Sequence, residues 1–157
     1  MIVRRDLLIG VVSDTHGTLD PRIPRAFDGV DRILHAGDIG SVDVLLELET
    51  LGPVTAVLGN TDHAIPGFSL PLTATLDLAG VRLYVAHQFR SGDVGGLPPG
   101  TRVVVSGHTH VPRVDSDDGI LFVNPGAAFR SRLPGGRRTV GLIEIRDGHA
   151  TVRIIEL

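Results

Sequence analysis

Hydrophobic positions in the first half of the chain follow two patterns, one typical of buried strands and one typical of helices. Runs rich in β-branched residues predict strands at 7–13 (LLIGVVS), 31–38 (DRILHAGD) and 53–60 (PVTAVLGN). Between them, 22–29 (RIPRAFDG) predicts a short helix with an early proline, and 41–51 (SVDVLLELETL) predicts an amphipathic helix capped by its first serine. This alternation predicts parallel strands joined by right-handed crossovers.

In the second half, apolar and polar residues alternate and glycine-containing turns interrupt the runs. Three segments predict β-hairpins: 72–87 turning at AG, 111–126 turning within SDDG, and 139–157 turning at DG. A further strand is predicted at the start of 101–110 (TRVVVSGHTH). We therefore expect one α/β domain over 1–157, with two sheets packed face to face and helices outside.

Composition narrows the class of protein. The chain has 157 residues, 42% hydrophobic and 21% charged, which suits a globular domain with a sizeable core. No apolar run approaches the roughly 18 residues of a membrane span, and the N-terminal apolar run is too short for a signal peptide. We expect a cytoplasmic protein without membrane association. Because cysteine is absent, disulfides and thiolate metal sites are excluded.

The charged residues exclude further functions. The formal net charge is −3, which offers no electrostatic footprint for nonspecific nucleic-acid binding. The 15 basic residues are all arginine, so Schiff-base and P-loop lysine chemistry are excluded.

Polar side chains with metal-binding capacity follow one predicted strand after another. They are Asp14 and His16, Asp38, Asn60, His87, and the pair His108 and His110. Most lie beside glycine or another small residue, as in SDTHG, AGDIG, LGNTD and SGHTH, where the backbone can turn tightly. Because ligands bind at the carboxyl ends of the strands in open α/β sheets, we expect these side chains to share one site.

This residue set favours two divalent ions. Histidine and carboxylate together suit Mn, Fe, Co, Ni or Zn better than Ca or Mg. Two ions roughly 3.5–4 Å apart need a bridging carboxylate, which a lone Asp between the others can supply. On extended backbone, His108 and His110 would point to the same face because side-chain direction has a period of two. Each motif alone is typical of an ordinary turn or cap; their order at successive strand ends indicates the metal site.

The motifs SDTHG, LHAGDI, LGNTD, YVAHQF and SGHTH together resemble those of the calcineurin-like metallophosphoesterases. The resemblance covers essentially the whole chain and points to the small, single-domain YfcE-like phosphodiesterase branch. It implies a four-layer α-β-β-α fold with a two-sheet core. It also implies hydrolysis of phosphodiesters by a hydroxide shared between two metal ions, with Mn the expected metal.

The resemblance also assigns roles to the candidate residues. It gives Asp14, His16 and His110 to the first metal, Asn60, His87 and His108 to the second, and Asp38 to the bridge between them. Asp38, Asn60, His87 and His108 would also serve catalysis, and the Asn60 amide could donate to a phosphate oxygen.

The chain departs from the family pattern in three places. Thr61 replaces the histidine that larger relatives use as a general acid, which indicates either leaving groups that need little protonation or protonation by water. Phe89 replaces a second histidine after His87, which could change substrate contacts. Segment 90–100 is short and rich in Gly and Pro for the helix usual there.

Several polar residues have two open interpretations. His35 is either a hydrogen-bonded core histidine or a support of the site, and Asp62 either orients a ligand or caps a turn. Asn124 either holds a loop near the metals or marks a structural turn. His63 and His149 are expected at the surface. The arginines near LPGG are expected in a solvated turn, with substrate phosphate as the alternative; they are Arg130, Arg132, Arg137 and Arg138.

A non-catalytic scaffold is the alternative function, because a retromer subunit related to this branch keeps the fold after losing key ligands. Completeness of the ligand set favours the enzyme. An amidohydrolase barrel needs about 250 residues, more than the chain has. The resemblance implies that the substrate is a small phosphodiester and that nucleic acid would interact only as a substrate. It also implies assembly as a homodimer or homotetramer. The sequence leaves the substrate, the metal and any general acid open.

Overall fold

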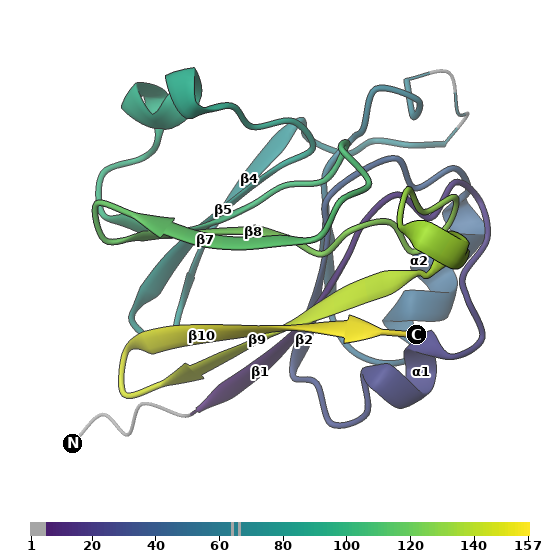
Figure 1. Ribbon diagram of the computed structural model, residues 1–157, viewed down its shortest axis with the longest axis horizontal. Helices are drawn as coiled ribbons and strands as arrows, with labels where there is room; N and C mark the ends of the chain where they lie inside the picture. The colour runs from purple at the N-terminus through teal and green to yellow at the C-terminus, as the bar shows by residue number, and fades with distance from the viewer. Residues whose placement is uncertain (1–5, 64, 66) are drawn as a thin grey trace.

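The computed structural model describes residues 6–157 except 64 and 66. The N-terminal residues 1–5, part of the segment for which no signal peptide is predicted, lie outside the described residues. Two five-stranded sheets, ordered β10-β9-β1-β2-β3 and β4-β5-β6-β8-β7, form the body of the molecule (Figure 1). The predicted pair of facing sheets is therefore confirmed.

The first sheet holds the strands of the N-terminal half and the last hairpin. Its elements, with the helices between them, are β1 (Leu7–Val12), α1 (Ile23–Ala26), β2 (Arg32–His35), α2 (Val42–Glu49), β3 (Val54–Ala56), β9 (Thr139–Arg146) and β10 (His149–Glu156). β1, β2 and β3 run parallel, as predicted, and β9 joins β1 antiparallel. Ser41 caps α2 by accepting a hydrogen bond from the amide of Asp43.

The second sheet holds the middle of the chain. Its elements are β4 (Thr73–Leu78), β5 (Val81–Ala86), β6 (Thr101–Val105), β7 (Arg113–Asp117) and β8 (Ile120–Asn124). β5, β6 and β8 are parallel neighbours, so their carboxyl ends share one edge. The predicted hairpin turns fall at Ala79-Gly80, Asp118-Gly119 and Asp147-Gly148, where every residue has a positive φ.

Two hydrophobic clusters hold the layers together. One lies between the sheets, where Ile9 and Val11 of β1 meet Leu83 of β5 and Val103 of β6. The other lies between the first sheet and the helices, where Val12 meets Phe27 and its neighbours. Successive β1 residues alternate between the two clusters because side chains alternate faces along a strand.

The helices pack on the first sheet, on the side away from the second (Figure 1). The outer layer on the second sheet belongs to the crossover from β5 to β6. Within the described residues it contains only the 3₁₀ helix η1 (Ser91–Gly96). The short Gly- and Pro-rich segment thus forms no regular α-helix, as its composition predicts. A second 3₁₀ turn, η2 (Pro134–Gly136), precedes β9. No described helix has the length and apolarity needed to cross a membrane.

Candidate metal centre

The candidate ligands all lie on loops that leave the carboxyl ends of parallel strands. Asp14 and His16 follow β1, Asp38 follows β2, Asn60 follows β3, His87 follows β5, and His108 and His110 follow β6. Both sheets therefore contribute to one site. The site combines loops far apart in sequence, as predicted from the strand ends.

Backbone hydrogen bonds tie these loops to one another. The amide of Asp14 donates to the carbonyl of Gly37 at 3.0 Å, and the amide of His16 donates to the carbonyl of Asp38 at 3.0 Å. Within the second sheet, where β5 and β6 are neighbours, the amide of Gly107 donates to the carbonyl of His87 at 2.9 Å. The loops are thus held in register by the fold.

Most candidate ligands adopt a left-handed backbone. The φ angles are 56° at Asp14, 48° at His16, 54° at Asp38, 71° at His108 and 61° at His110. The expectation that His108 and His110 point together because their backbone is extended is therefore wrong. β6 ends at Val105, and the histidines lie in the turn that follows it. A positive φ is uncommon in residues other than glycine, and residues with this conformation cluster at functional sites.

Asp14, His16 and His110 form the first cluster, in which the ligand atoms lie within 4.8 Å of one another. The Nε2 of His110 is 3.2 Å from Oδ1 of Asp14 and 3.4 Å from Nε2 of His16. Asp14 is fully buried and its Oδ1 has no hydrogen-bond partner. A buried, unsatisfied carboxylate oxygen is costly, and a cation is a partner that suits it.

Asn60, His87 and His108 form the second cluster. The Oδ1 of Asn60 is 2.9 Å from Nε2 of His87 and 3.1 Å from Nδ1 of His108. Asp38 lies between the clusters: its Oδ2 is 3.4 Å from Nε2 of His87 and 3.9 Å from Nε2 of His16. This position suits the bridging role that the sequence resemblance implies for Asp38.

Backbone carbonyls set the tautomers of two of these histidines. The Nδ1 of His87 is 2.7 Å from the carbonyl of Ala36, and the Nδ1 of His110 is 2.9 Å from the carbonyl of Arg130. Because a carbonyl oxygen only accepts, each Nδ1 donates, and each neutral ring presents an unprotonated Nε2 to a carboxylate. Acceptors facing acceptors in a buried site are the arrangement that a bound cation stabilises.

Burial and neighbouring groups shift the pKa values of Asp38 and His87. Burial raises the pKa of Asp38, but hydrogen bonds from the Nε2 of a protonated His87 and from the Thr61 amide, 3.0 Å away, outweigh it and place the pKa well below its usual range. For His87, burial lowers the pKa, but the hydrogen bonds to Asp38 and to the Ala36 carbonyl outweigh it, so the pKa is raised. A proton on His87 and a metal ion at its Nε2 therefore compete.

Two glycines permit the loops to approach closely. A Cβ at Gly59 would overlap the amide nitrogen and the Oδ1 of Asp38, and a Cβ at Gly107 would overlap the Ser13 hydroxyl. Gly59 therefore lets the loop after β3 lie against the loop after β2. Gly107 does the same for the loops after β6 and β1.

His35 and Asp62 support the site from beneath it. Asp62 is buried and accepts hydrogen bonds from the amides of Ile39, Gly40 and Gly59. It caps a turn and also holds the loops that carry Asp38 and Asn60. His35 is fully buried in the core, with Nε2 2.9 Å from the Thr15 hydroxyl and Nδ1 accepting from the Gly37 amide.

Asn124 holds the histidine turn in place. Its amide nitrogen donates to the carbonyl of Gly107 at 2.9 Å and lies 3.1 Å from the hydroxyl of Thr109. Its Oδ1 accepts from the amide of Gly126, so it also forms the local turn. Both interpretations of Asn124 are confirmed.

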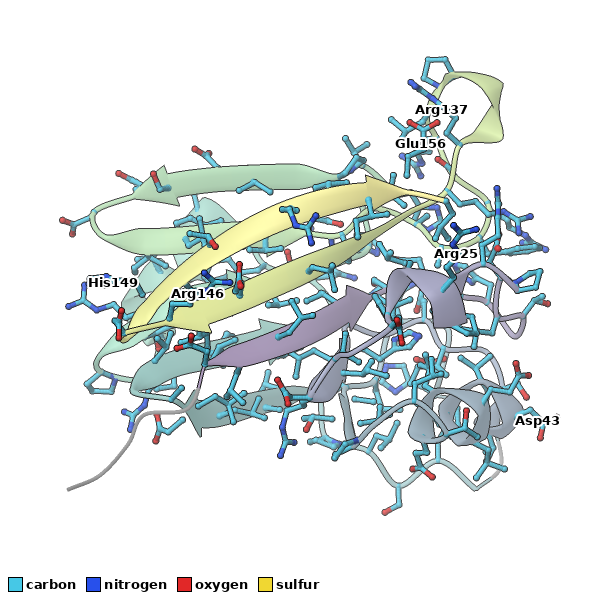
Figure 2. All side chains as sticks on the ribbon, turned by 90° about the horizontal axis from the view of Figure 1, so that it is seen from below. Arg25, Asp43, Arg137, Arg146, His149 and Glu156 are labelled. Carbon is cyan, nitrogen blue, oxygen red and sulfur yellow. The ribbon has the colours of Figure 1, made fainter. Side chains whose placement is uncertain are left out.

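The remaining predicted polar residues lie at the surface. His63 and His149 are exposed, as expected. Figure 2 shows His149 at the end of the sheet opposite Arg137. Arg137 pairs with Glu156 at 3.3 Å, and Arg138 pairs with the buried carboxylate of Asp20 at 3.0 Å. The turn around LPGG is thus solvated except at Arg138.

Besides Asp62 and Asn124, further groups orient the ligands, and sequence patterns alone miss these. The Ser13 hydroxyl donates to Oδ2 of Asp14 at 2.6 Å, and the amide of His108 donates to the same atom at 3.1 Å. The carbonyls of Ala36 and Arg130 orient histidines from distant segments. Backbone groups carry no side-chain signal, so only Ser13, adjacent to Asp14, could have been noticed in the sequence.

The structure combines a core of two mixed sheets with a buried Asp/His cluster at the strand ends that could hold metal ions. Residues 7–148 match the model of the calcineurin-like phosphoesterase superfamily domain. The chain belongs to the calcineurin-like phosphoesterase superfamily.

Relatives in archaea support this placement. The chain is 37% identical, over 81% of its length and 80% of the relative's, to a protein named "Probable metallophosphoesterase" from Methanothermobacter thermautotrophicus. It is 26% identical to a phosphodiesterase of Methanocaldococcus jannaschii, over 87% of this chain and 92% of that one.

Solved structures show the same fold. An archaeal phosphodiesterase structure superposes with a TM-score of 0.75 at 24% identity, covering 96% of this chain and 100% of that one. Vacuolar Protein Sorting 29 from Cryptosporidium parvum also gives 0.75, at 22% identity, covering 97% and 98%.

Proposed function

We propose that this chain is a phosphodiesterase that uses two divalent cations, Mn²⁺ being the expected ion, to hydrolyse small phosphodiesters. The observation that carries the proposal is the convergence of potential metal-ligand atoms. The carboxylates of Asp14 and Asp38 and the Nε2 atoms of His87 and His110 meet at the strand ends, and the Asp14 Oδ1 has no hydrogen-bond partner.

The donor set fits two ions bridged by Asp38. Asp14, His16 and His110 would hold one, and Asn60, His87 and His108 the other. Mixed imidazole and carboxylate ligation suits first-row transition ions. When bound, two such cations lower the pKa of water so that hydroxide is available near neutral pH, and they offset the charge that develops on phosphoryl oxygens.

Residues at the mouth of the site are placed to bind the substrate. Asn60 and His108 are exposed, whereas Asp14, Asp38 and His87 are buried. Because the Oδ1 of Asn60 faces His87 and His108, its amide NH₂ group is left to donate to a phosphate oxygen.

Protonation of the leaving group is less well supported in this chain than in larger relatives. Thr61 stands where larger relatives have a histidine, and its amide is used to bind Asp38. We therefore expect faster turnover of aryl esters, whose leaving groups need no proton, than of alkyl esters.

The test is hydrolysis of bis(4-nitrophenyl) phosphate with added Mn²⁺, with EDTA as the metal-free control. We expect Mn-dependent turnover that Asp38→Ala and His108→Ala each lower by at least about 1,000-fold. His149→Ala, at the far end of the sheet, should match the wild type. Absence of metal-dependent turnover in the wild type would overturn the proposal and favour the scaffold function.

A further inference from the structure

A cavity adjoins the candidate metal centre on the side of Asn60 and His87. Its volume is about 570 Å³, within the range of roughly 300–1,000 Å³ typical of small-molecule sites. Asn60 and His87 line the cavity and also belong to the second ligand cluster. A phosphoester bound at the metal centre would therefore extend one of its substituents into this cavity.

Aromatic and apolar side chains form much of the lining. Phe89 and Tyr84 meet edge to face, with ring centroids 6.2 Å apart, and Phe89 also contacts Phe122 at 5.9 Å. Phe89 is thus held from two directions while it faces the cavity. At the rim, Leu72 is 61% exposed although it is a large apolar side chain.

The polar part of the lining is mostly uncharged. Gln88 and His63 contribute polar groups, and the carboxylate of Asp93 accepts a hydrogen bond from the Arg90 amide at the start of η1. Among the described lining residues no lysine or arginine occurs. A second phosphate would find no cationic partner there, whereas a flat, neutral ring would find aromatic faces and hydrogen-bonding groups.

We propose that this cavity binds the base of a nucleoside attached to the substrate phosphate, with the ring against Phe89 and Tyr84. The inference rests on the proposed function, because the metal centre would hold the phosphate. It gives a role to Phe89, the residue that departs from the family pattern. Stacking of a base on an aromatic side chain strengthens binding by roughly tenfold.

The experiment compares two ligands that differ only by the base. Binding of adenosine 5′-monophosphate and of ribose 5-phosphate to the Mn²⁺-loaded protein is measured by calorimetry. We expect the wild type to bind the adenosine ester at least about tenfold more tightly. Phe89→Ala should remove most of this preference, and Phe89→Tyr should retain it.

Glycine substitutions test the cavity without deleting a packed side chain. Gly92 and Gly96 line the cavity, and a Cβ added at either meets no atom within 4 Å. Gly92→Leu and Gly96→Leu should therefore fold, bind Mn²⁺ normally and lose the preference for the base. The matched control is Gly95→Leu, in the same 3₁₀ helix but outside the lining, which should keep the preference.

Equal affinity of the two ligands for the wild type, or a preference that survives both lining glycine substitutions, overturns the proposal. Turnover of bis(4-nitrophenyl) phosphate is measured on the same preparations. Metal-dependent turnover without base preference refutes the cavity assignment alone. Base preference without turnover supports the cavity and refutes the phosphodiesterase.

Discussion

The two ends of the sheets contain similar backbone conformations for different reasons. At one end, the hairpin turns place Ala79, Asp118 and Asp147 at φ of 48–49°, each followed by a glycine of positive φ. At the other end, Asp14, Asp38 and His108 have φ of 54–71° without belonging to hairpin turns. The first group follows the local rules of two-residue turns, in which both central residues are left-handed.

Tertiary contacts impose the second group. The loops of the metal centre are held by hydrogen bonds between distant segments, such as the Thr61 amide to Asp38 and the Asn124 amide to the carbonyl of Gly107. A left-handed backbone can therefore arise either from a short local motif or from contacts spread over the whole fold. Only the second arrangement brings ligands from several strands together.

Two glycine substitutions, one at each end of the sheets, should have the largest difference in effect. Gly59→Ala adds a Cβ against the Asp38 amide, and we expect a loss of about 3 kcal/mol of stability together with loss of Mn²⁺ binding. Gly119→Ala, in a hairpin turn at φ 75°, should cost only about 1 kcal/mol and leave Mn²⁺ binding unchanged. Urea unfolding and calorimetry measure both quantities. Equal effects of the two substitutions would contradict the distinction.

The two histidines of the turn after β6 belong to different ligand clusters. His110 lies with Asp14 and His16, and His108 lies with Asn60 and His87. We expect His110→Ala to weaken one Mn²⁺ site and His108→Ala the other, each on the order of 100-fold. Metal titration followed by structures of both variants tests this. Loss of the same site in both variants would show that the clusters do not bind separate ions.

The buried His35 makes the stability of the site end depend on pH. Burial, reinforced by the nearby His87, lowers the pKa of His35 to about 3. Because the unfolded chain takes up this proton near pH 6.5 and the folded chain does not, the stabilising effect of neutral His35 is complete above pH 6.5. It is then lost by about 1.4 kcal/mol per pH unit as the pH falls toward 3.

His35→Asn removes this titration. Between pH 6.5 and 5, in EDTA, the wild type should lose about 2 kcal/mol more than the variant. Chemical unfolding at several pH values measures the difference, and both proteins share every other histidine. Parallel pH profiles would show that the pKa of His35 is not lowered in the folded protein.

The smallest effect on stability and metal binding is expected at the Ser41 cap of α2, which acts locally and far from the metal ligands. Ser41→Ala removes the side-chain cap of α2 and should cost about 1 kcal/mol. Because the cap satisfies only the Asp43 amide, Mn²⁺ affinity should match the wild type. A change in metal affinity would mean that the start of α2 takes part in organising the site.

The fold was predictable to the extent that it follows local patterns. β-branched runs located the strands around Val11 and Val104, alternation and turn dipeptides located the hairpins, and Ser41 was identified as a cap. The parallel pairing of β1, β2 and β3 followed from crossover rules, and the two-sheet core followed from the family resemblance, whereas the antiparallel pairing of β9 with β1 was not predicted. The missing α-helix between β5 and β6 was predictable because Gly and Pro fill that segment.

The residue pattern alone shows which side chains are available for a metal centre and that they follow successive strands. Tertiary structure decided how they meet: the left-handed turn of His108 and His110, the orientation of His87 by the Ala36 carbonyl, and the cavity beside Phe89. The physical reason is that turns and periodicity depend on neighbouring residues. Ligand geometry depends on backbone groups from distant segments, which leave no pattern in the residues they orient.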